Sequence, residues 1–132
     1  MSSDRSNVNS ISNILIVDDE ENARIGLSKL LADEGYKVSS AGDGIEALSV
    51  LQGDQYQLVI TDIDMPRMNG ISFLSELNQQ YPRLSVLMMT ALGTVEPYME
   101  AMNLGVYEYL HKPIKLDDLK SVMLKLSRET GH

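Results

Sequence analysis

Residues 56–70 read YQLVITDIDMPRMNG, and this stretch decides the fold. The run LVI at 58–60 is apolar without interruption, which is typical of a strand covered on both faces in a parallel sheet. Asp62 follows it, and the pairs Met65-Pro66 and Asn69-Gly70 then favour a turn. Asp62 is therefore predicted where a buried strand reaches the ligand-binding edge of an open sheet. The alternative for Asp62 alone is an acid that starts a turn.

The composition excludes several classes of protein. With 132 residues the chain is one domain that buries roughly two-thirds of its unfolded surface. It has no cysteine and two histidines, so disulfides and thiolate or histidine zinc sites are excluded. A net charge of −8 argues against contact with nucleic acid or an anionic membrane. Without a signal peptide or an apolar run that could span a bilayer, the chain is predicted to be cytoplasmic.

Strand patterns and helix patterns alternate along the chain. The other predicted strands are 14–17, 36–41, 84–89 and 107–111. Helical spacing of apolar residues predicts a helix at about 22–34, a second through Ala47, Leu48 and Leu51, a third through Ile71, Leu74 and Leu77, a fourth after Thr94 and a fifth through Leu119, Val122, Met123 and Leu126. This alternation predicts an α/β fold of the flavodoxin-like type, a five-stranded parallel sheet flanked by five helices. Placing the most apolar strands at the centre gives the strand order 2-1-3-4-5.

Polar residues follow four of the predicted strands. Asp18 and Asp19 end the first, Asp62 the third, Thr90 the fourth and Lys112 the fifth. Because the carboxyl ends of parallel strands share one edge, we expect these side chains to meet. Clustered carboxylates repel one another unless a cation holds them ionised, and an all-oxygen donor set favours Mg²⁺.

This predicted cluster suits phosphoryl transfer. With Mg²⁺ and Lys112 offsetting charge, Asp62 can act as a nucleophile that forms an aspartyl phosphate. Thr90 and Lys112 would then each bind a phosphoryl oxygen. Taken singly, the residues have simpler interpretations: Thr90 as a strand-end hydroxyl, Lys112 as a solvated cation and Asp18 as a helix cap.

Four motifs in the same order resemble the receiver domains of two-component response regulators, from the chemotaxis-regulator-like superfamily. They are LIVDDEE at 15–21, TDIDMPRMNG at 61–70, MMTA at 88–91 and YLHKPI at 109–114. The resemblance covers residues 13 to about 128. It implies that Asp62 accepts a phosphoryl group from a histidine kinase or phosphotransfer protein in a phosphorelay, and that the domain catalyses its own phosphorylation and dephosphorylation.

The resemblance also implies a set of metal ligands and a switch. Asp19 would bind Mg²⁺ directly, Asp18 through water, and Asp64 through its backbone carbonyl, beside Asp62. Phosphorylation would draw Thr90 inward, and Tyr109 would fill the space behind it.

The switch would change the surface formed by the helix after Thr94, the fifth strand and the last helix, where a partner or a second copy in a homodimer would bind. A permanently packed ring is the alternative for Tyr109.

Two other functions fit parts of the pattern. Asp62-Ile63-Asp64 after a strand also resembles the nucleophile pair of haloacid-dehalogenase-like phosphohydrolases, with Asp64 as general acid. Those enzymes place their metal-binding acidic pair after the lysine, whereas Asp18 and Asp19 precede everything here. An interaction module without phosphorylation is the third possibility.

The predicted organisation is a disordered leader at 1–12, a receiver domain at 13–128, and a tail or the start of a linker at 129–132. The run from Met88 to Ile114 is most similar to receivers attached to ATPase-type transcription activators.

Overall fold

The computed structural model describes residues 11–63, 67–68, 70–90 and 103–130 of the chain. Within these ranges five strands alternate with four helices. In chain order the elements are β1 (Asn13–Val17), α2 (Glu21–Asp33), β2 (Lys37–Ala41), α3 (Gly44–Leu51), β3 (Leu58–Asp62), α4 (Gly70–Gln80), β4 (Ser85–Thr90), β5 (Glu108–His111) and α6 (Leu116–Thr130).

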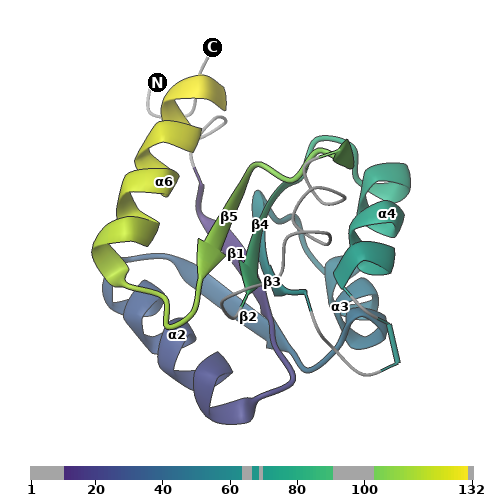
Figure 1. Cartoon of the computed structure of the whole chain (residues 1–132), viewed down its shortest axis with the longest axis horizontal. Helices are drawn as coiled ribbons and strands as arrows, with labels where there is room; N and C mark the ends of the chain where they lie inside the picture. The colour runs from purple at the N-terminus through teal and green to yellow at the C-terminus, as the bar shows by residue number, and fades with distance from the viewer. Residues whose placement is uncertain (1–10, 64–66, 69, 91–102, 131–132) are drawn as a thin grey trace.

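The five strands form one parallel sheet in the order β2-β1-β3-β4-β5, which confirms the predicted topology (Figure 1). All five residues of the central strand β3 are buried, as its apolar run predicts. The register pairs Ile60 with Ile16 on one side and with Leu87 on the other, so apolar side chains form rows across the sheet. The edge strand β2 has one buried residue, Ala41, in keeping with its more polar sequence.

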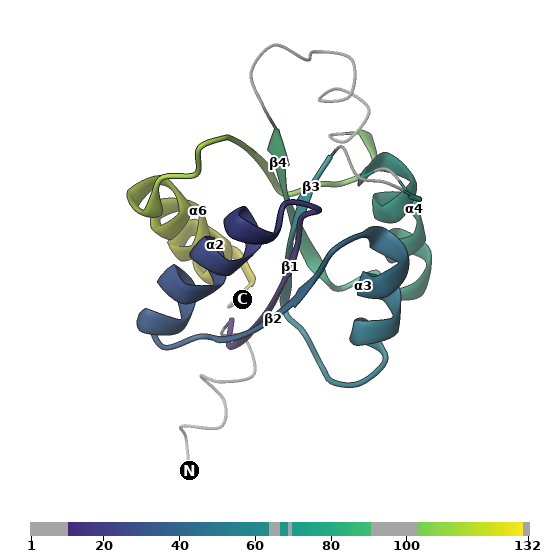
Figure 2. The same cartoon turned by 90° about the horizontal axis from the view of Figure 1, so that it is seen from below.

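Helices cover both faces of the sheet, with α2 and α6 on one face and α3 and α4 on the other (Figure 2). Successive residues of β1 divide between these faces. Ile14 and Ile16 belong to the apolar cluster of α2 and α6, whereas Leu15 and Val17 belong to the cluster of α3 and α4. Because burying one such side chain stabilises the fold by about 1.5–3 kcal/mol, the two clusters fix the register of the strands.

Local signals determine where several helices begin and end. Gly35 follows α2 with a left-handed φ of 101°, the conformation expected of a glycine after a helix. Asp43 caps α3, where its Oδ1 accepts the Glu46 N–H at 2.8 Å. The last helix, α6, has acids in its first turn and Arg128 in its last, which suits the helix dipole. Among the helices of the described ranges, none has the length and apolar character needed to cross a bilayer.

The helix predicted after Thr94 falls mainly in 91–102, outside the described residues. Ser12, which the sequence places in the leader, is bonded to the domain: its N–H and hydroxyl each donate to Gln57 Oε1 at 3.0 Å. Its carbonyl accepts the Lys37 N–H at 2.9 Å, so the chain is attached to the sheet one residue before β1.

Two helical glycines should respond in opposite ways to alanine. At Gly26, exposed in α2, an added Cβ meets nothing within 4 Å, so Gly26→Ala should raise the free energy of unfolding. We expect a gain of about 0.5–1 kcal/mol from helix propensity. At Gly70 a Cβ would lie 2.5 Å from the Ile63 Cα, so Gly70→Ala should cost about 1–3 kcal/mol. Urea unfolding measures both, and a Gly70→Ala variant as stable as the wild type would contradict this packing.

Candidate functional site

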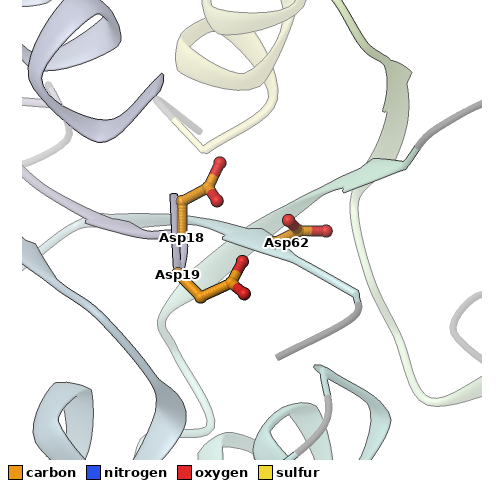
Figure 3. A group of neighbouring side chains, drawn as sticks. All are labelled: Asp18, Asp19 and Asp62. Carbon is orange, nitrogen blue, oxygen red and sulfur yellow. The ribbon is translucent and has the colours of Figure 1, made fainter. Parts of the chain in front are cut away.

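Three carboxylates meet at the edge of the sheet where the parallel strands end. Asp18 and Asp19 directly follow β1, and Asp62 is the last residue of the neighbouring strand β3. One carboxylate oxygen of each acid lies within 4.8 Å of the other two (Figure 3). The acids predicted at separate strand ends therefore form one cluster.

The three acids differ in exposure. Asp18 is 2 % exposed and Asp62 is 7 % exposed, whereas Asp19 lies in the exposed part of the cluster. Removing an ionised carboxylate from water costs several kcal/mol unless its charge is compensated. The buried side of the cluster therefore requires a cation.

Lys112, directly after β5, supplies that cation. Its Nζ donates to Asp18 Oδ2 at 2.9 Å and to Asp62 Oδ2 at 2.8 Å. Burial by itself lowers the pKa of Lys112, but the hydrogen bonds to Asp62 and Asp18 more than offset this, and the pKa lies above its usual value. The backbone N–H of Lys112 donates to the Thr90 carbonyl at 2.7 Å, which fixes the residue at the end of β4.

Asp18 is held by several contacts and does not cap α2. Its Oδ1 accepts the Glu20 N–H at 3.0 Å, and its carbonyl accepts Arg24 Nη1 at 2.8 Å. The N-cap residue of α2 is Glu20, which makes no side-chain capping bond. The interpretation of Asp18 as a helix cap is therefore wrong, and its carboxylate is oriented toward Lys112.

Thr90 and Tyr109 lie where the sequence predicts them. Thr90 is the last residue of β4 and is 2 % exposed. Tyr109 is in β5, paired in register with Met88, and is buried in the apolar cluster of α3 and α4. Its ring centroid lies 6.5 Å from that of the exposed His111. The aromatic residue is thus on the inside, beside the strand that carries Thr90.

A second ionic contact involves the segment after Asp62 and was not predicted. Arg67 donates from Nε and Nη2 to Asp43 Oδ2 at 2.9 and 2.6 Å. The spacing Asp43-x-x-Glu46 is a capping signal that could have identified the acid, and Glu46 Oε1 also accepts the Gly42 N–H at 2.7 Å. No local signal identifies Arg67 as a partner, because 24 residues separate the pair.

The donor set of the acidic cluster fits a hard divalent cation. Asp18, Asp19 and Asp62 offer carboxylate oxygens, the ligands that Mg²⁺ and Ca²⁺ prefer, and these oxygens converge. Asp64, whose backbone carbonyl the resemblance assigns to the metal, lies outside the described residues.

Fold and site together define a doubly wound α/β domain with an acidic site at the carboxyl edge of its sheet. The family model of the response regulator receiver domain matches residues 14–124. This range contains the three clustered acids and Lys112, and the chain belongs to the response regulator receiver domain family.

Two relatives show the extent of the similarity. The chain is 39 % identical over 113 residues to the regulatory protein AtoC of Escherichia coli K12, an alignment that covers 86 % of this chain and 24 % of AtoC. It is 37 % identical over 121 residues to the transcriptional regulatory protein ZraR of Salmonella typhimurium, covering 89 % of this chain and 27 % of ZraR. The chain thus spans about a quarter of the length of these relatives.

Solved structures agree with the fold. A response regulator receiver domain protein from Clostridium thermocellum superposes with a TM-score of 0.84 at 29 % identity, covering 90 % of this chain and 96 % of that one. NtrX from Brucella abortus, in a complex with ATP, gives a TM-score of 0.85 at 32 % identity, covering 91 % of this chain and 28 % of NtrX. These similarities support the receiver domain and do not favour the haloacid-dehalogenase-like phosphohydrolase.

Asp43→Asn should remove a contribution of the Asp43 charge to the free energy of unfolding, and this contribution should depend on pH. The Glu46 N–H lowers the pKa of Asp43, burial opposes this in part, and Arg67 lowers it further, to a net value below the usual range. The ionised form thus contributes stability above the unfolded pKa of about 3.9, and this is lost as the pH falls through the folded pKa. Asparagine keeps the capping oxygen but carries no charge.

At pH 7 we expect the wild type to be more stable than Asp43→Asn by about 0.5–1 kcal/mol, and the difference to shrink below about pH 4. Urea unfolding of both proteins, from pH 7 to below about pH 4, measures this difference in the free energy of unfolding. A difference that stays constant down to the acid limit would contradict the assignment.

Proposed function

We propose that Asp62 is the phosphoacceptor, and that a histidine kinase or a phosphotransfer protein supplies its phosphoryl group. The observation that carries this proposal is the position of the Lys112 ammonium, 2.8 Å from Asp62 and 2.9 Å from Asp18, in a cluster with Asp19 on its exposed side. A cation fixed beside a carboxylate can bind the oxygens of an incoming phosphoryl group. Membership of the receiver family supports the same role.

Mg²⁺ is the cation that we propose for the cluster. The resemblance assigns Asp19 as a direct ligand, Asp18 as a ligand through water and the backbone carbonyl of Asp64 as a further ligand, with Asp62 in the same metal-binding set. The all-oxygen donor set of the three acids supports this choice. When bound, the ion would reduce the repulsion between these acids and the phosphoryl oxygens.

In the proposed reaction an Asp62 carboxylate oxygen attacks the phosphorus of a phosphohistidine. An O–P bond forms, the P–N bond breaks, and its electron pair stays on the imidazole nitrogen. Lys112 then pairs with one phosphoryl oxygen, and the Thr90 hydroxyl donates to another. Because Lys112 contacts Asp62 directly before the reaction, its ammonium must exchange a carboxylate for a phosphoryl oxygen. This exchange connects phosphorylation to the end of β5.

The signal would pass from Thr90 to Tyr109. A phosphoryl group on Asp62 would carry about −1.5 to −2 charge near neutral pH, in place of the −1 of the carboxylate, and would draw Thr90 toward it. The Tyr109 ring, already buried, would then occupy the space that Thr90 leaves. The responding surface includes β5, α6 and the helix predicted after Thr94, and it would bind a partner or a second copy of the chain as a homodimer.

We further propose that this receiver, residues 13–128, regulates transcription through an output domain reached by a linker that begins at 129–132. Two relatives support this, the regulatory protein AtoC and the transcriptional regulatory protein ZraR, each about four times as long as the part that matches this chain. Residues 1–10 of the predicted leader lie outside the described part of the chain, and Ser12 at its end is bonded to the domain. For the protein as a whole we propose a cytoplasmic location. The net charge of −8 argues against nucleic-acid or membrane contact by the receiver itself.

Asp62→Asn should abolish phosphorylation, because the amide nitrogen and oxygen are poor nucleophiles compared with a carboxylate. Intact mass spectrometry after incubation with acetyl phosphate and Mg²⁺ should detect one phosphoryl adduct on the wild type and none on the variant. Asp54→Asn, an exposed acid paired with Lys37, is the matched control and should be modified like the wild type. Chelation of Mg²⁺ should also prevent modification. An adduct retained by Asp62→Asn would place the phosphoacceptor elsewhere.

Lys112→Ala should separate modification from signalling. Asp62 remains available, so the variant should still be phosphorylated by acetyl phosphate, yet the connection from the phosphoryl group to β5 is lost. We expect the phosphorylation-dependent change in self-association, measured by analytical ultracentrifugation, or in partner binding, to be weak or absent. Lys37→Ala, which removes an exposed pair with Asp54 on the opposite edge strand β2, is the control. An unchanged response in Lys112→Ala would rule out the proposed role.

A further inference from the structure

The segment after Asp62 is attached to the start of α3 by charge. The Arg67 guanidinium contacts Asp43 Oδ2 through two nitrogens, at 2.9 and 2.6 Å. The arginine side chain is 58 % exposed, but the aspartate side chain is 12 % exposed, so one member of the pair is largely shielded from water. A two-nitrogen contact on a shielded carboxylate fixes orientation as well as distance.

The backbone of Arg67 is in a conformation that needs support. Its φ is 66°, in the left-handed region that a side chain with a Cβ rarely adopts. Such conformations persist where the surrounding contacts determine them. The Arg67 side chain forms an ion pair with Asp43, and this pair accounts for an arginine where glycine or asparagine would be less strained.

Two close contacts extend the attachment on either side of the ion pair. Met68 packs over Gly44, the residue after Asp43, where an added Cβ would lie 3.0 Å from the Met68 sulfur. Gly70 packs directly on the backbone of Ile63 and Asp62, and its N–H donates to the Ile63 carbonyl at 2.7 Å. A displacement of Arg67 and Met68 would therefore reach the start of α4 and the backbone of Asp62.

We propose that Asp43 and Arg67 form a latch that positions Asp62 within the acidic cluster. Both would act through the packing of the backbone and not as metal ligands, so we assign them as positioning residues. The latch rests on the proposed function in one respect only, that the cluster binds Mg²⁺. Opening the latch frees Arg67 and Met68 from α3, loosens the packing of Gly70 on the Asp62 backbone, and weakens the convergence of Asp62 with its two neighbouring acids.

The two carboxylate oxygens of Asp43 have different partners, so capping of α3 and the contact with Arg67 can be tested separately. Oδ1 accepts the Glu46 N–H and caps α3, while Oδ2 accepts Arg67. Asp43→Asn therefore keeps a capping oxygen and faces Arg67 with an amide in place of a carboxylate. Arg67→Asn removes the guanidinium and places at φ 66° a residue that tolerates this conformation. Both variants should fold.

A double-mutant cycle tests the latch. The affinity for Mg²⁺ is measured by NMR titration of the ¹⁵N-labelled chain without phosphodonor, following the amides of Asp62 and Ile63, for the wild type, Asp43→Asn, Arg67→Asn and the double variant. We expect each single variant to raise the Kd for Mg²⁺ roughly 3- to 10-fold, and the double variant to be no weaker than the worse single one. Hydrogen exchange of the Gly70 amide should accelerate in all three variants, because its bond to Ile63 opens more often.

Asp54→Asn is the matched control, because it removes an exposed pair with Lys37 elsewhere on the domain and should leave the Kd and the Gly70 exchange unchanged. Single variants with wild-type affinity and exchange would overturn the latch, and so would effects that multiply in the double variant. If the wild type binds Mg²⁺ but takes no phosphoryl group on Asp62, the proposed function is wrong. The double-mutant cycle still shows whether the latch positions Asp62. If the wild type binds no Mg²⁺, both proposals fail.

Discussion

The pairing of one ammonium with two buried carboxylates constrains this domain more than any other contact. Asp18 and Asp62 come from neighbouring strands and lie side by side, and Lys112 reaches both, at 2.9 and 2.8 Å. Removing one partner of such a group leaves a charge that water does not fully solvate. The contact exists because β1, β3 and β5 all end at the same edge of one parallel sheet, and a different strand order would separate the lysine from the acids.

The apolar core gives the charged group its fixed geometry. The residues before Asp18 and Asp62, at 14–17 and 58–60, are fully buried, so the strands that carry the acids cannot shift without exposing two apolar clusters. After the strands end, positioning depends on short polar contacts. Asp18 is held through Glu20 and Arg24, Lys112 through the Thr90 carbonyl, and the segment after Asp62 through its contacts with α3.

The strands and the acidic cluster could be predicted because their signals are local. An unbroken apolar run indicates a buried parallel strand, and a polar residue at its end marks the ligand-binding edge. The sheet order and the meeting of the three acids followed from this reasoning and from the resemblance. The contact of Arg67 with Asp43 could not be predicted. Nothing in the local sequence indicates that the backbone of Arg67 is left-handed, and its partner is 24 residues away. The bond from Ser12 to Gln57 was missed for the same reason, since a serine-rich terminus carries no signal for a distant glutamine.

The charge balance of the site favours a divalent cation over a monovalent one. With the three acids ionised and Lys112 protonated, the cluster carries a formal charge of −2, which one divalent ion neutralises. A phosphoryl group on Asp62 would carry about −1.5 to −2 in place of the −1 of the carboxylate, so the site would gain roughly −0.5 to −1 beyond the charge that the ion neutralises. In the proposed function this imbalance is the source of the signal, because the new negative charge attracts the hydrogen-bond donors that surround Asp62. Lys112 already contacts Asp18 and Asp62, and Thr90 ends β4 beside β3, so in the proposed function both residues would reorient toward the new phosphoryl oxygens.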